Sequence, residues 1–280
     1  MSTSLNGAPA RHDLATLVAI LDLEPIERDL FRSRRTGVAG RRLYGGEVAA
    51  QALVAAERTA GEDVGVHSLH AYFLRPGDAG HKVVYRVDTL QDGRNFRRRR
   101  VTAVQHGEPI LCLDTSFTTD RSGAGNHETP PGAPDPEDCP DAGDTFPSGT
   151  PHPATMFDLR AVEDGHEVLH PFLRDMLWFR LRGEGFDGRV STAAVLTYIS
   201  DLSLVATVRR ASGRADVSHL TSLDHVLWFH NEPRFDDWLL YAKSCPAVGE
   251  LRGLATGRIF HRDGTLIASA AQEGLLHARR

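Results

Sequence analysis

The chain of 280 residues lacks the features that define several large classes of protein. Its three cysteines, Cys112, Cys139 and Cys245, are an odd number at wide spacing. This spacing argues against a disulfide framework and a cysteine-based zinc site, and it favours a reducing compartment. No run approaches the roughly 18 apolar residues that a membrane-spanning helix needs. The formal net charge of −5 provides no basic surface for nucleic acid. We therefore expect no nucleic-acid or membrane partner and a cytoplasmic location.

We also expect the apolar segment near the amino terminus not to be a secretory signal. The apolar segment 14–23 is interrupted by Asp22, and no small-residue cleavage site follows it. Its leucines recur at helical spacing, so we expect an amphipathic helix over 13–22. The hydrophobic content of 41% and charged content of 25% are ordinary for a globular protein of about two domain-sized units.

What the sequence does contain is an internal repeat. Each copy has a histidine, a tyrosine and two glycines in the same order, followed by an apolar strand. The markers are His70, Tyr85, Gly93 and Gly107 in the first copy, and His225, Tyr241, Gly249 and Gly264 in the second. A repeat of this length is too long for a solenoid unit. Two copies of one β-rich unit predict one composite fold.

The two copies differ at positions that matter for chemistry. In this register Ser222 and Gln272 of the second copy correspond to His67 and Thr115 of the first. The sequence therefore predicts an asymmetric site inside a symmetric scaffold.

Each copy is predicted as a strand, a helix and a run of antiparallel strands. In the first copy we expect a strand at 29–36, a helix at 47–60 and strands at 65–74, 82–90, 95–105 and 109–118. In the second we expect strands at 156–163 and 176–182, a long helix at 190–207 and strands at 219–230, 237–244, 252–261 and 265–273. Residues 119–153, rich in proline, glycine, aspartate and serine, are predicted to form a linker. A sheet with one open face needs a helix to cover that face, so each sheet should pack on its helix.

Asp201 is the most conspicuous ionisable residue, because it lies in an apolar helix beside Tyr198, Leu204 and Val205. Burial of an ionised carboxylate raises its proton affinity unless a donor holds it. Proteins prepare general bases in this way. The alternative is a structural acid that is bonded to a neighbouring strand.

Three further positions carry polar groups at the ends of elements. Gln272 ends an apolar strand, where an inward-facing amide can hold a water or polarise a carbonyl; a solvated strand end is the alternative. Ser222 opens a strand without a G-x-S-x-G motif, so it is better suited to binding water than to acting as a nucleophile. Gly45 and Gly46 precede a helix and offer backbone N–H groups to an anion or an oxyanion, although many helices begin after glycine. His225, like His70, is interpreted as a packing histidine.

Several longer motifs together resemble one family. They are Leu43–Val48, His67–Gly77, Ser200–Leu202, Ser222–His225 with Trp228–His230, Trp238–Tyr241, and Ala268–Ser269 with Gln272–Gly274. In this order they resemble the acyl-CoA thioesterase II (TesB-like) family from about residue 14 to 275, with the weakest likeness in 119–155.

The resemblance implies an α+β double hotdog fold, in which two antiparallel sheets each wrap a long central helix within one chain. The N-terminal hotdog repeat would span 13–118, the linker 119–155, and the C-terminal repeat, which carries the catalytic residues, 156–275. Members of the family hydrolyse acyl-CoA to a free fatty acid and CoA without a metal or cofactor. The family's catalytic set maps onto Asp201, Ser222 and Gln272. Some members carry threonine in place of Ser222, so we expect an altered rate and not a loss of activity.

The resemblance and the residues predict one mechanism. A water bound by Asp201, Ser222 and Gln272 attacks the thioester carbonyl, Asp201 takes its proton, and backbone N–H groups at Gly45 and Gly46 receive the oxyanion. No metal, cofactor or acyl-enzyme is expected, and a homodimer or tetramer is the expected assembly. The alternatives are a hotdog enoyl-CoA hydratase or dehydratase, and a non-catalytic acyl-CoA-binding protein. The hydratase is disfavoured because the helix that carries Asp201 has no histidine.

Overall fold

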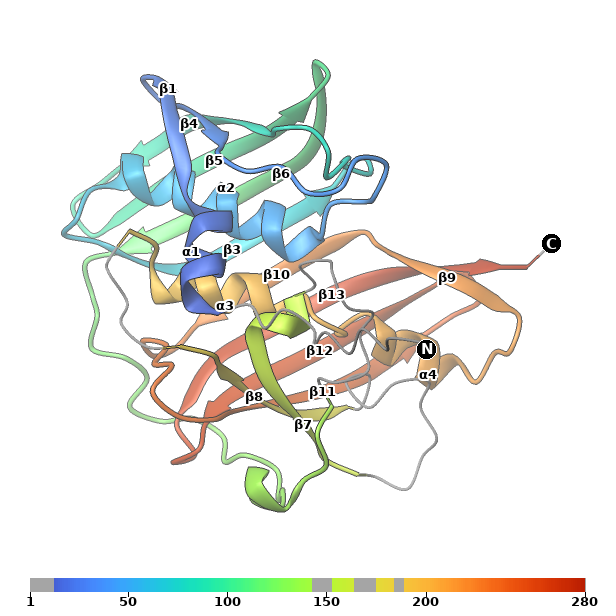
Figure 1. Cartoon of the computed structure of the whole chain (residues 1–280). Helices are drawn as coiled ribbons and strands as arrows, with labels where there is room; N and C mark the ends of the chain where they lie inside the picture. The colour runs from blue at the N-terminus through green and yellow to red at the C-terminus, as the bar shows by residue number, and fades with distance from the viewer. Residues whose placement is uncertain (1–12, 143–152, 164–174, 184–188, 280) are drawn as a thin grey trace, which may run out of the picture.

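The computed structural model describes residues 13–142, 153–163, 175–183 and 189–279 (Figure 1). In the first copy its elements are α1 (Leu14–Leu21), β1 (Leu23–Glu27), β2 (Leu30–Ser33), α2 (Gly45–Ala60), β3 (Gly65–Phe73), β4 (Val84–Asp92), β5 (Phe96–Gln105) and β6 (Glu108–Thr118). Two 3-10 helices follow, η1 (Pro136–Asp138) and η2 (Pro153–Met156). The second copy contains β7 (Phe157–Ala161), β8 (Met176–Leu181), α3 (Thr192–Ser200), α4 (Ala206–Ser212), β9 (Val217–Ser222), β10 (Asp224–Phe229), β11 (Leu239–Val248), β12 (Arg252–His261) and β13 (Leu266–Ala278).

Within the described residues the strands form a 13-stranded sheet in the order β1-β2-β4-β5-β6-β3-β10-β13-β12-β11-β8-β7, with β9 beside β13. The copies join where β3 pairs antiparallel with β10, and Ala71 lies opposite His225. Figure 1 shows the first copy at the top and the second at the bottom. The two predicted hotdog sheets are therefore continuous at one shared edge, and the α+β double hotdog prediction is confirmed.

Helices α2 and α3 lie in the interior, near the junction of the two halves of the sheet (Figure 1). A single core cluster of buried residues includes Leu53 and Leu69 of the first copy and Ile199 and Leu227 of the second. The amino-terminal end of α2 meets the carboxyl-terminal end of α3, and a Cβ at Gly46 would overlap the backbone carbonyl oxygen of Tyr198. Glycine at this position therefore allows the two helices to approach each other.

The prediction of one long helix over 190–207 is wrong. Helix α3 ends at Ser200, Asp201 is its C-cap, and α4 begins only at Ala206. Between them Ser203 has a φ of 59°. A left-handed residue cannot continue a right-handed helix, and for a residue with a Cβ this conformation costs about 1–2 kcal/mol. The break places Asp201 at a helix end and not within a helix face.

The predicted strand 219–230 is also interrupted, at Leu223, and both resulting strands pair with β13. The first copy has a matching irregularity in β3, between Val66 and Ser68. Such bulges occur near active sites, where they re-aim side chains. Strand β1 was not predicted, because its sequence, LEPIE, contains proline and two charged residues.

The bulge corrects the predicted correspondence of Ser222 with His67. Val66 lies opposite Phe117, as Ser222 lies opposite Gly274, so Val66 is the true counterpart of Ser222. Matching His70 with His225 shifted the alignment by one residue, and such a shift reverses the face of a strand. His225 is fully buried, whereas His70 is exposed, so the packing role predicted for His70 is wrong.

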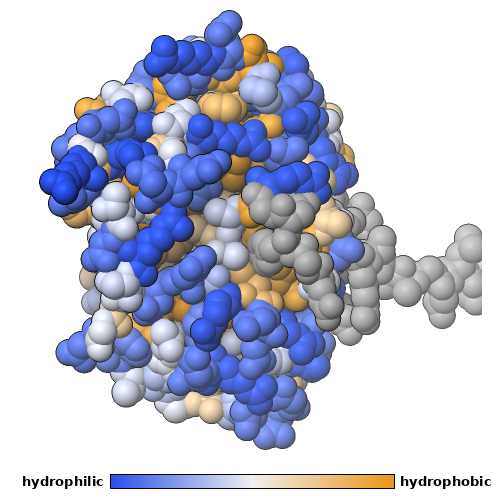
Figure 2. All heavy atoms as spheres, turned by 90° about the vertical axis from the view of Figure 1, so that its left-hand side faces the viewer, coloured by the Kyte–Doolittle hydropathy of each residue, from blue (hydrophilic) through white to orange (hydrophobic). Residues whose placement is uncertain are grey.

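The segment between the copies is largely irregular where it is described, and η1 is its one helical turn within 119–142. Residues 143–152 of the predicted linker lie outside the described residues, and the predicted domain limits stay predictions. None of the described helices has the length and apolar character needed to cross a membrane. Figure 2 shows a mainly hydrophilic face with hydrophobic residues between the polar ones, chiefly around its middle.

Candidate active site

Two donors hold the carboxylate of Asp201 where α3 ends. Gly46 N, at the start of α2, donates to Oδ2 at 2.9 Å, and Gln272 Nε2, on β13, donates to Oδ1 at 2.6 Å. The amino-terminal end of a helix carries a partial positive charge, which favours an anion there. The break after α3 therefore directs the carboxylate onto the start of the other central helix and fixes both of its oxygens.

The side chain of Gln272 faces inward, which is the first of the two alternatives that the sequence offered for it. Its side chain is completely buried, and its Oε1 has no hydrogen-bond partner among the described residues. A buried polar atom without a partner is uncommon, because desolvation is unfavourable unless a hydrogen bond or a water compensates for it. The amide thus donates to Asp201 on one side and has a vacant acceptor on the other.

Ser222 ends β9 and does not open a strand, because the bulge at Leu223 separates β9 from β10. It lies opposite Gly274, two residues along β13 from Gln272, so Ser222 and Gln272 belong to the same face of the sheet. Ser222 lines one cavity together with Asp201, whereas the fully buried Gln272 is not among the residues of its lining and reaches it through its bond to Asp201. In the described part of the chain, no hydrogen bond engages its Oγ.

The cavity has a volume of about 360 Å³ and lies between the two copies, with walls from α2, β3, β6, the end of α3, β9 and β13. Much of its wall is apolar; these side chains are Leu43, Val48, Phe73, Leu74, Ile110, Leu111, Leu220 and Leu275. Thr221 also lines it, although neighbouring residues of a regular strand face opposite sides, and its Oγ1 lies 3.0 Å from His277 Nε2. The arrangement combines an apolar compartment with one carboxylate and two neighbouring hydroxyls.

Basic groups gather on another part of the wall. Arg42 lines the cavity, is exposed and forms no ion pair within the described residues. His219 and His277 stack with ring centroids 4.0 Å apart and an interplanar angle of 7°. Desolvation, together with the neighbouring His277 and Arg42, lowers the pKa of His219. Arg42 is thus a permanent cation beside two imidazoles.

The glycine pair has two different environments. Gly46 directs its N–H to Asp201, whereas Gly45 lines the cavity and its N–H has no hydrogen bond to another described residue. A Cβ at Gly45 would lie 2.9 Å from Asp201 Oδ2 and 3.0 Å from the ring of Phe73. A side chain at Gly45 would therefore crowd the carboxylate.

Supporting residues that the sequence analysis missed surround Asp201. Tyr44 OH donates to Tyr198 O at 2.8 Å, and Tyr241 OH donates to Ser200 O at 2.7 Å, so both hydroxyls satisfy carbonyls at the end of α3. Burial first, and then the Asp201 charge, raises the pKa of both tyrosines well above its ordinary value, which keeps them as donors.

The role of Tyr241 could have been predicted from the internal repeat of the sequence. Tyr241 and Tyr85 occupy the same position in the two copies, and Tyr85 OH also donates inward, to Gln51 of α2. A tyrosine repeated beside a central helix indicates a hydrogen bond to that helix.

His225 forms a second layer behind the carboxylate. It is fully buried, with its Nε2 2.8 Å from Ser200 Oγ, and burial lowers its pKa despite the charges of Asp201 and Asp224. The packing role predicted for His225 is therefore consistent with its surroundings. No group of three or more His, Cys, Asp or Glu side chains among the described residues is arranged to hold a metal ion.

Comparison with known proteins gives a consistent result over both copies. The family model described as "Acyl-CoA thioesterase N-terminal domain" matches residues 33–119, and the one described as "Acyl-CoA thioesterase C-terminal domain" matches 136–276. Human acyl-coenzyme A thioesterase 8 is 35% identical, over 94% of this chain and 89% of that protein. Acyl-CoA thioesterase 2 of Haemophilus influenzae is 34% identical, over 94% of this chain and 97% of that protein.

The solved structures agree. Acyl-CoA thioesterase II TesB2 from Mycobacterium marinum aligns with a TM-score of 0.78 and 38% identity, covering 93% of this chain and 98% of that one. The resemblance inferred from the motifs is thereby confirmed. These relatives are all named as thioesterases, and none of the three is named as a hydratase. The chain belongs to the acyl-CoA thioesterase family of thioester hydrolases.

Proposed function

We propose that the chain hydrolyses acyl-CoA to a free fatty acid and CoA, with a water held by Asp201, Ser222 and Gln272 as the nucleophile. The observation that carries the proposal is the pair of contacts on Asp201, from Gln272 at 2.6 Å and from Gly46 at 2.9 Å. They fix the carboxylate in the wall of the cavity that Ser222 also lines. A carboxylate, a hydroxyl and an amide oxygen together provide the acceptors and the donor that one water can use.

Each group has a separate task in the reaction. Ser222 Oγ donates to the water, and the vacant Oε1 of Gln272 accepts from it. Asp201 takes the second proton of the water as its oxygen attacks the thioester carbonyl carbon. The C–S bond then breaks, and the thiolate of CoA leaves and takes up the proton held by Asp201, which restores the carboxylate. Because a thiolate is a good leaving group, the enzyme needs chiefly to place the water and stabilise charge, and no acyl-enzyme forms.

The two glycines divide the role that was predicted for both. Gly45 N–H is free to donate to the oxyanion that develops on the carbonyl oxygen, since it lines the cavity beside Asp201. Gly46 N–H is engaged by the carboxylate, so its contribution is to orient the base. The oxyanion assignment of Gly46 is therefore replaced in this proposal.

The lining of the cavity supports the same substrate. The apolar walls suit an acyl chain, because transfer of hydrocarbon from water to such a surface is favourable. Arg42, with His219 and His277 beside it, suits the phosphate groups of CoA. A thioester without phosphate groups would contact the apolar walls but would make no use of the basic region around Arg42.

Release of thiol from acyl-CoAs of graded chain length tests the proposal. The wild type should release thiol with the carboxylic acid as the second product, and Asp201→Asn should retain its fold and lose about 10³-fold in kcat. Absence of turnover with retained acyl-CoA binding would support the binding-protein alternative. Loss of enoyl absorbance without thiol release would support the hydratase. Unchanged hydrolysis by Asp201→Asn would remove Asp201 from the mechanism.

We also propose a homodimer or tetramer and a cytoplasmic location, as the sequence predicts. Size-exclusion chromatography with light scattering measures the first, and a monomeric mass would contradict it. Fractionation of the native cells measures the second.

A further inference from the structure

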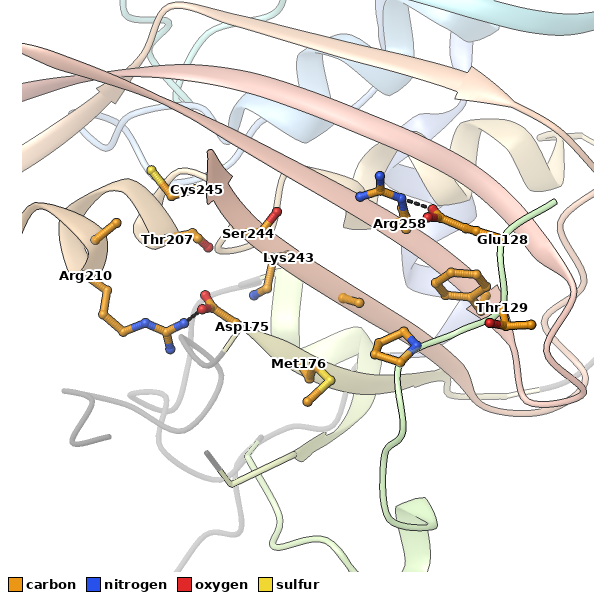
Figure 3. A pocket seen from close by; sticks show the side chains of 14 residues that line it. Glu128, Thr129, Asp175, Met176, Thr207, Arg210, Lys243, Ser244, Cys245 and Arg258 are labelled. Atoms are coloured by element: carbon orange, nitrogen blue, oxygen red, sulfur yellow. Dashed lines mark ion pairs between the residues drawn. The ribbon is translucent and has the colours of Figure 1, made fainter. Parts of the chain in front are cut away.

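A buried lysine contacts the turn that follows Asp201 without belonging to the cavity that Asp201 lines. Lys243 of β11 is 5% exposed and lines a separate cavity of about 1040 Å³ beside α4 (Figure 3). Within the described residues no carboxylate forms an ion pair with it. Arg210 of α4 engages the nearby Asp175, as the dashed line in Figure 3 marks. Burial of an ammonium group is unfavourable unless hydrogen bonds or an opposite charge compensate for its desolvation.

The amine hydrogen-bonds a side chain in the turn after Asp201, and it lies 5.5 Å from the centre of the Tyr241 ring. Lys243 Nζ donates to Ser203 Oγ at 2.6 Å. Ser203 is the residue with a φ of 59° that separates α3 from α4. A non-glycine residue stays in this conformation only when its surroundings hold it there.

Strand β11 holds the chain on both sides of Asp201. Tyr241 and Lys243 are two residues apart, so their side chains extend from the same face of the strand. Tyr241 OH bonds Ser200 O, one residue before Asp201, and Lys243 bonds Ser203, two residues after it. The segment that carries the carboxylate is thereby fixed at two points by one rigid strand.

Burial and, second, the charge of Arg210 lower the pKa of Lys243 to about 7. The side chain is therefore held in an environment that disfavours its charged form. The hydrogen bond to Ser203 and the nearby Tyr241 ring are the interactions that compensate the amine for its place in the core.

We propose that Lys243 is a positioning residue for the hydrolysis reaction: by holding Ser203 in its left-handed turn, it directs the Asp201 carboxylate onto Gly46 and Gln272. The inference rests on the proposed function of Asp201 as the base. It assigns to Lys243 no contact with substrate, because Lys243 lies outside the lining of the catalytic cavity.

Lys243→Met removes the amine and keeps an unbranched side chain of similar length. We expect kcat to fall about tenfold, since small misplacements of a catalytic group have effects of this size or larger, while KM stays within about twofold. Introducing Ser203→Gly into Lys243→Met should restore most of kcat, because glycine adopts a positive φ without support. Ser244→Ala, on the outward face of the same strand, is the control for substitutions in β11.

The pair Ser203→Ala and Ser203→Gly tests the same link while Lys243 is intact, and it replaces the first test if Lys243→Met does not fold. Both variants lose the hydroxyl, but only glycine tolerates the turn, so the alanine variant should have the lower kcat. Equal kcat values for the two, or a Lys243→Met enzyme that is as fast as the wild type, would overturn the inference.

Asp201→Asn is measured alongside these variants. If Asp201→Asn is inactive and Lys243→Met is unaffected, only the positioning role fails. If Asp201→Asn is active, the proposed function itself fails.

Discussion

The two central helices meet at both of their ends, and the two junctions differ in kind. At one junction Asp201, after the end of α3, accepts from Gly46 N at the start of α2. At the other, Glu57, in the last turns of α2, accepts at 2.8 Å from the hydroxyl of Ser191, the N-cap of α3. Each junction thus places a carboxylate near the start of the opposite helix, where the helix dipole favours it.

The strands beside the helices account for the difference. In the second copy Gln272 donates its amide to Asp201, and Ser222 presents a hydroxyl that no other described residue engages. At the corresponding positions of the first copy, Thr115 Oγ1 donates to the backbone of its own sheet, at Ser68 O, and Val66 has no polar group. A duplicated scaffold therefore supplies the geometry twice, and a few side chains decide which copy can hold a water.

Replacement of Gln272 and of its counterpart in the first copy should give the largest difference in kcat between the two copies. Gln272→Ala removes a donor to Asp201 and an acceptor for the water, so we expect kcat for thiol release to fall about 10²-fold. Thr115→Ala, its counterpart, should change stability but leave kcat within about twofold. Equal losses of kcat for the two variants would contradict the assignment of the site to the second copy.

The hydroxyl should matter less than the amide. Ser222→Ala should lower kcat about tenfold, because it removes one of three groups that orient the water. Thr221→Ala is the matched control, since Thr221 lines the same cavity but its hydroxyl is engaged by His277. Ser222→Thr, which keeps the hydroxyl, should remain active. A greater loss in Thr221→Ala than in Ser222→Ala would reverse the roles of the two hydroxyls.

The basic part of the cavity wall should affect binding and not chemistry. Arg42→Ala should raise KM for acyl-CoA about fivefold at low salt, with kcat nearly unchanged, because it removes a cation that pairs with phosphate. The KM for an acyl thioester of N-acetylcysteamine, which has no phosphate, should not change. A rise of KM for both substrates would locate the effect of Arg42 in the acyl compartment.

Two buried ionisable side chains, Glu57 in the first copy and Lys243 in the second, should make the free energy of unfolding depend on pH in opposite directions. Burial raises the pKa of Glu57 to about 7, so the folded state binds more protons than the unfolded state above pH 4.5, and stability falls as the pH rises towards 7. The pKa of Lys243 is lowered to about 7, so the unfolded state binds more protons up to pH 10.5, and stability rises with pH from 7 to 10.5.

Denaturant unfolding at several pH values measures both dependences. Glu57→Gln should remove the fall in the free energy of unfolding, about 3 kcal/mol across its window, and Lys243→Met should remove the rise, about 5 kcal/mol across its window. Parallel pH profiles of the wild type and both variants would contradict this account of the two groups.

Much of this arrangement was predictable from the sequence, and the exceptions have physical causes. The repeat markers and the apolar stripes predicted the paired sheets and helices, because alternation and helical periodicity are local properties of a chain. Motifs in the right order identified the family. The break at Ser203 was not predicted, since it depends on contacts from Tyr241 and Lys243, about 40 residues further along the chain.

The register error had a similar origin. Identical letters at His70 and His225 favoured an alignment that placed the two histidines in the same environment, whereas the bulges at His67 and Leu223 fix the true register. Bulges leave little trace in a single sequence. The direction of the Gly46 N–H was also not predictable, because it depends on where α3 ends.

The most direct test of the central claim is a double-mutant cycle on kcat between Asp201 and Gln272. If the two side chains act on one water, Asp201→Asn combined with Gln272→Ala should release thiol no more slowly than Asp201→Asn alone, since either change already abolishes the shared function. If the two losses multiply, Asp201 and Gln272 act independently, and the proposal of one jointly held water is wrong.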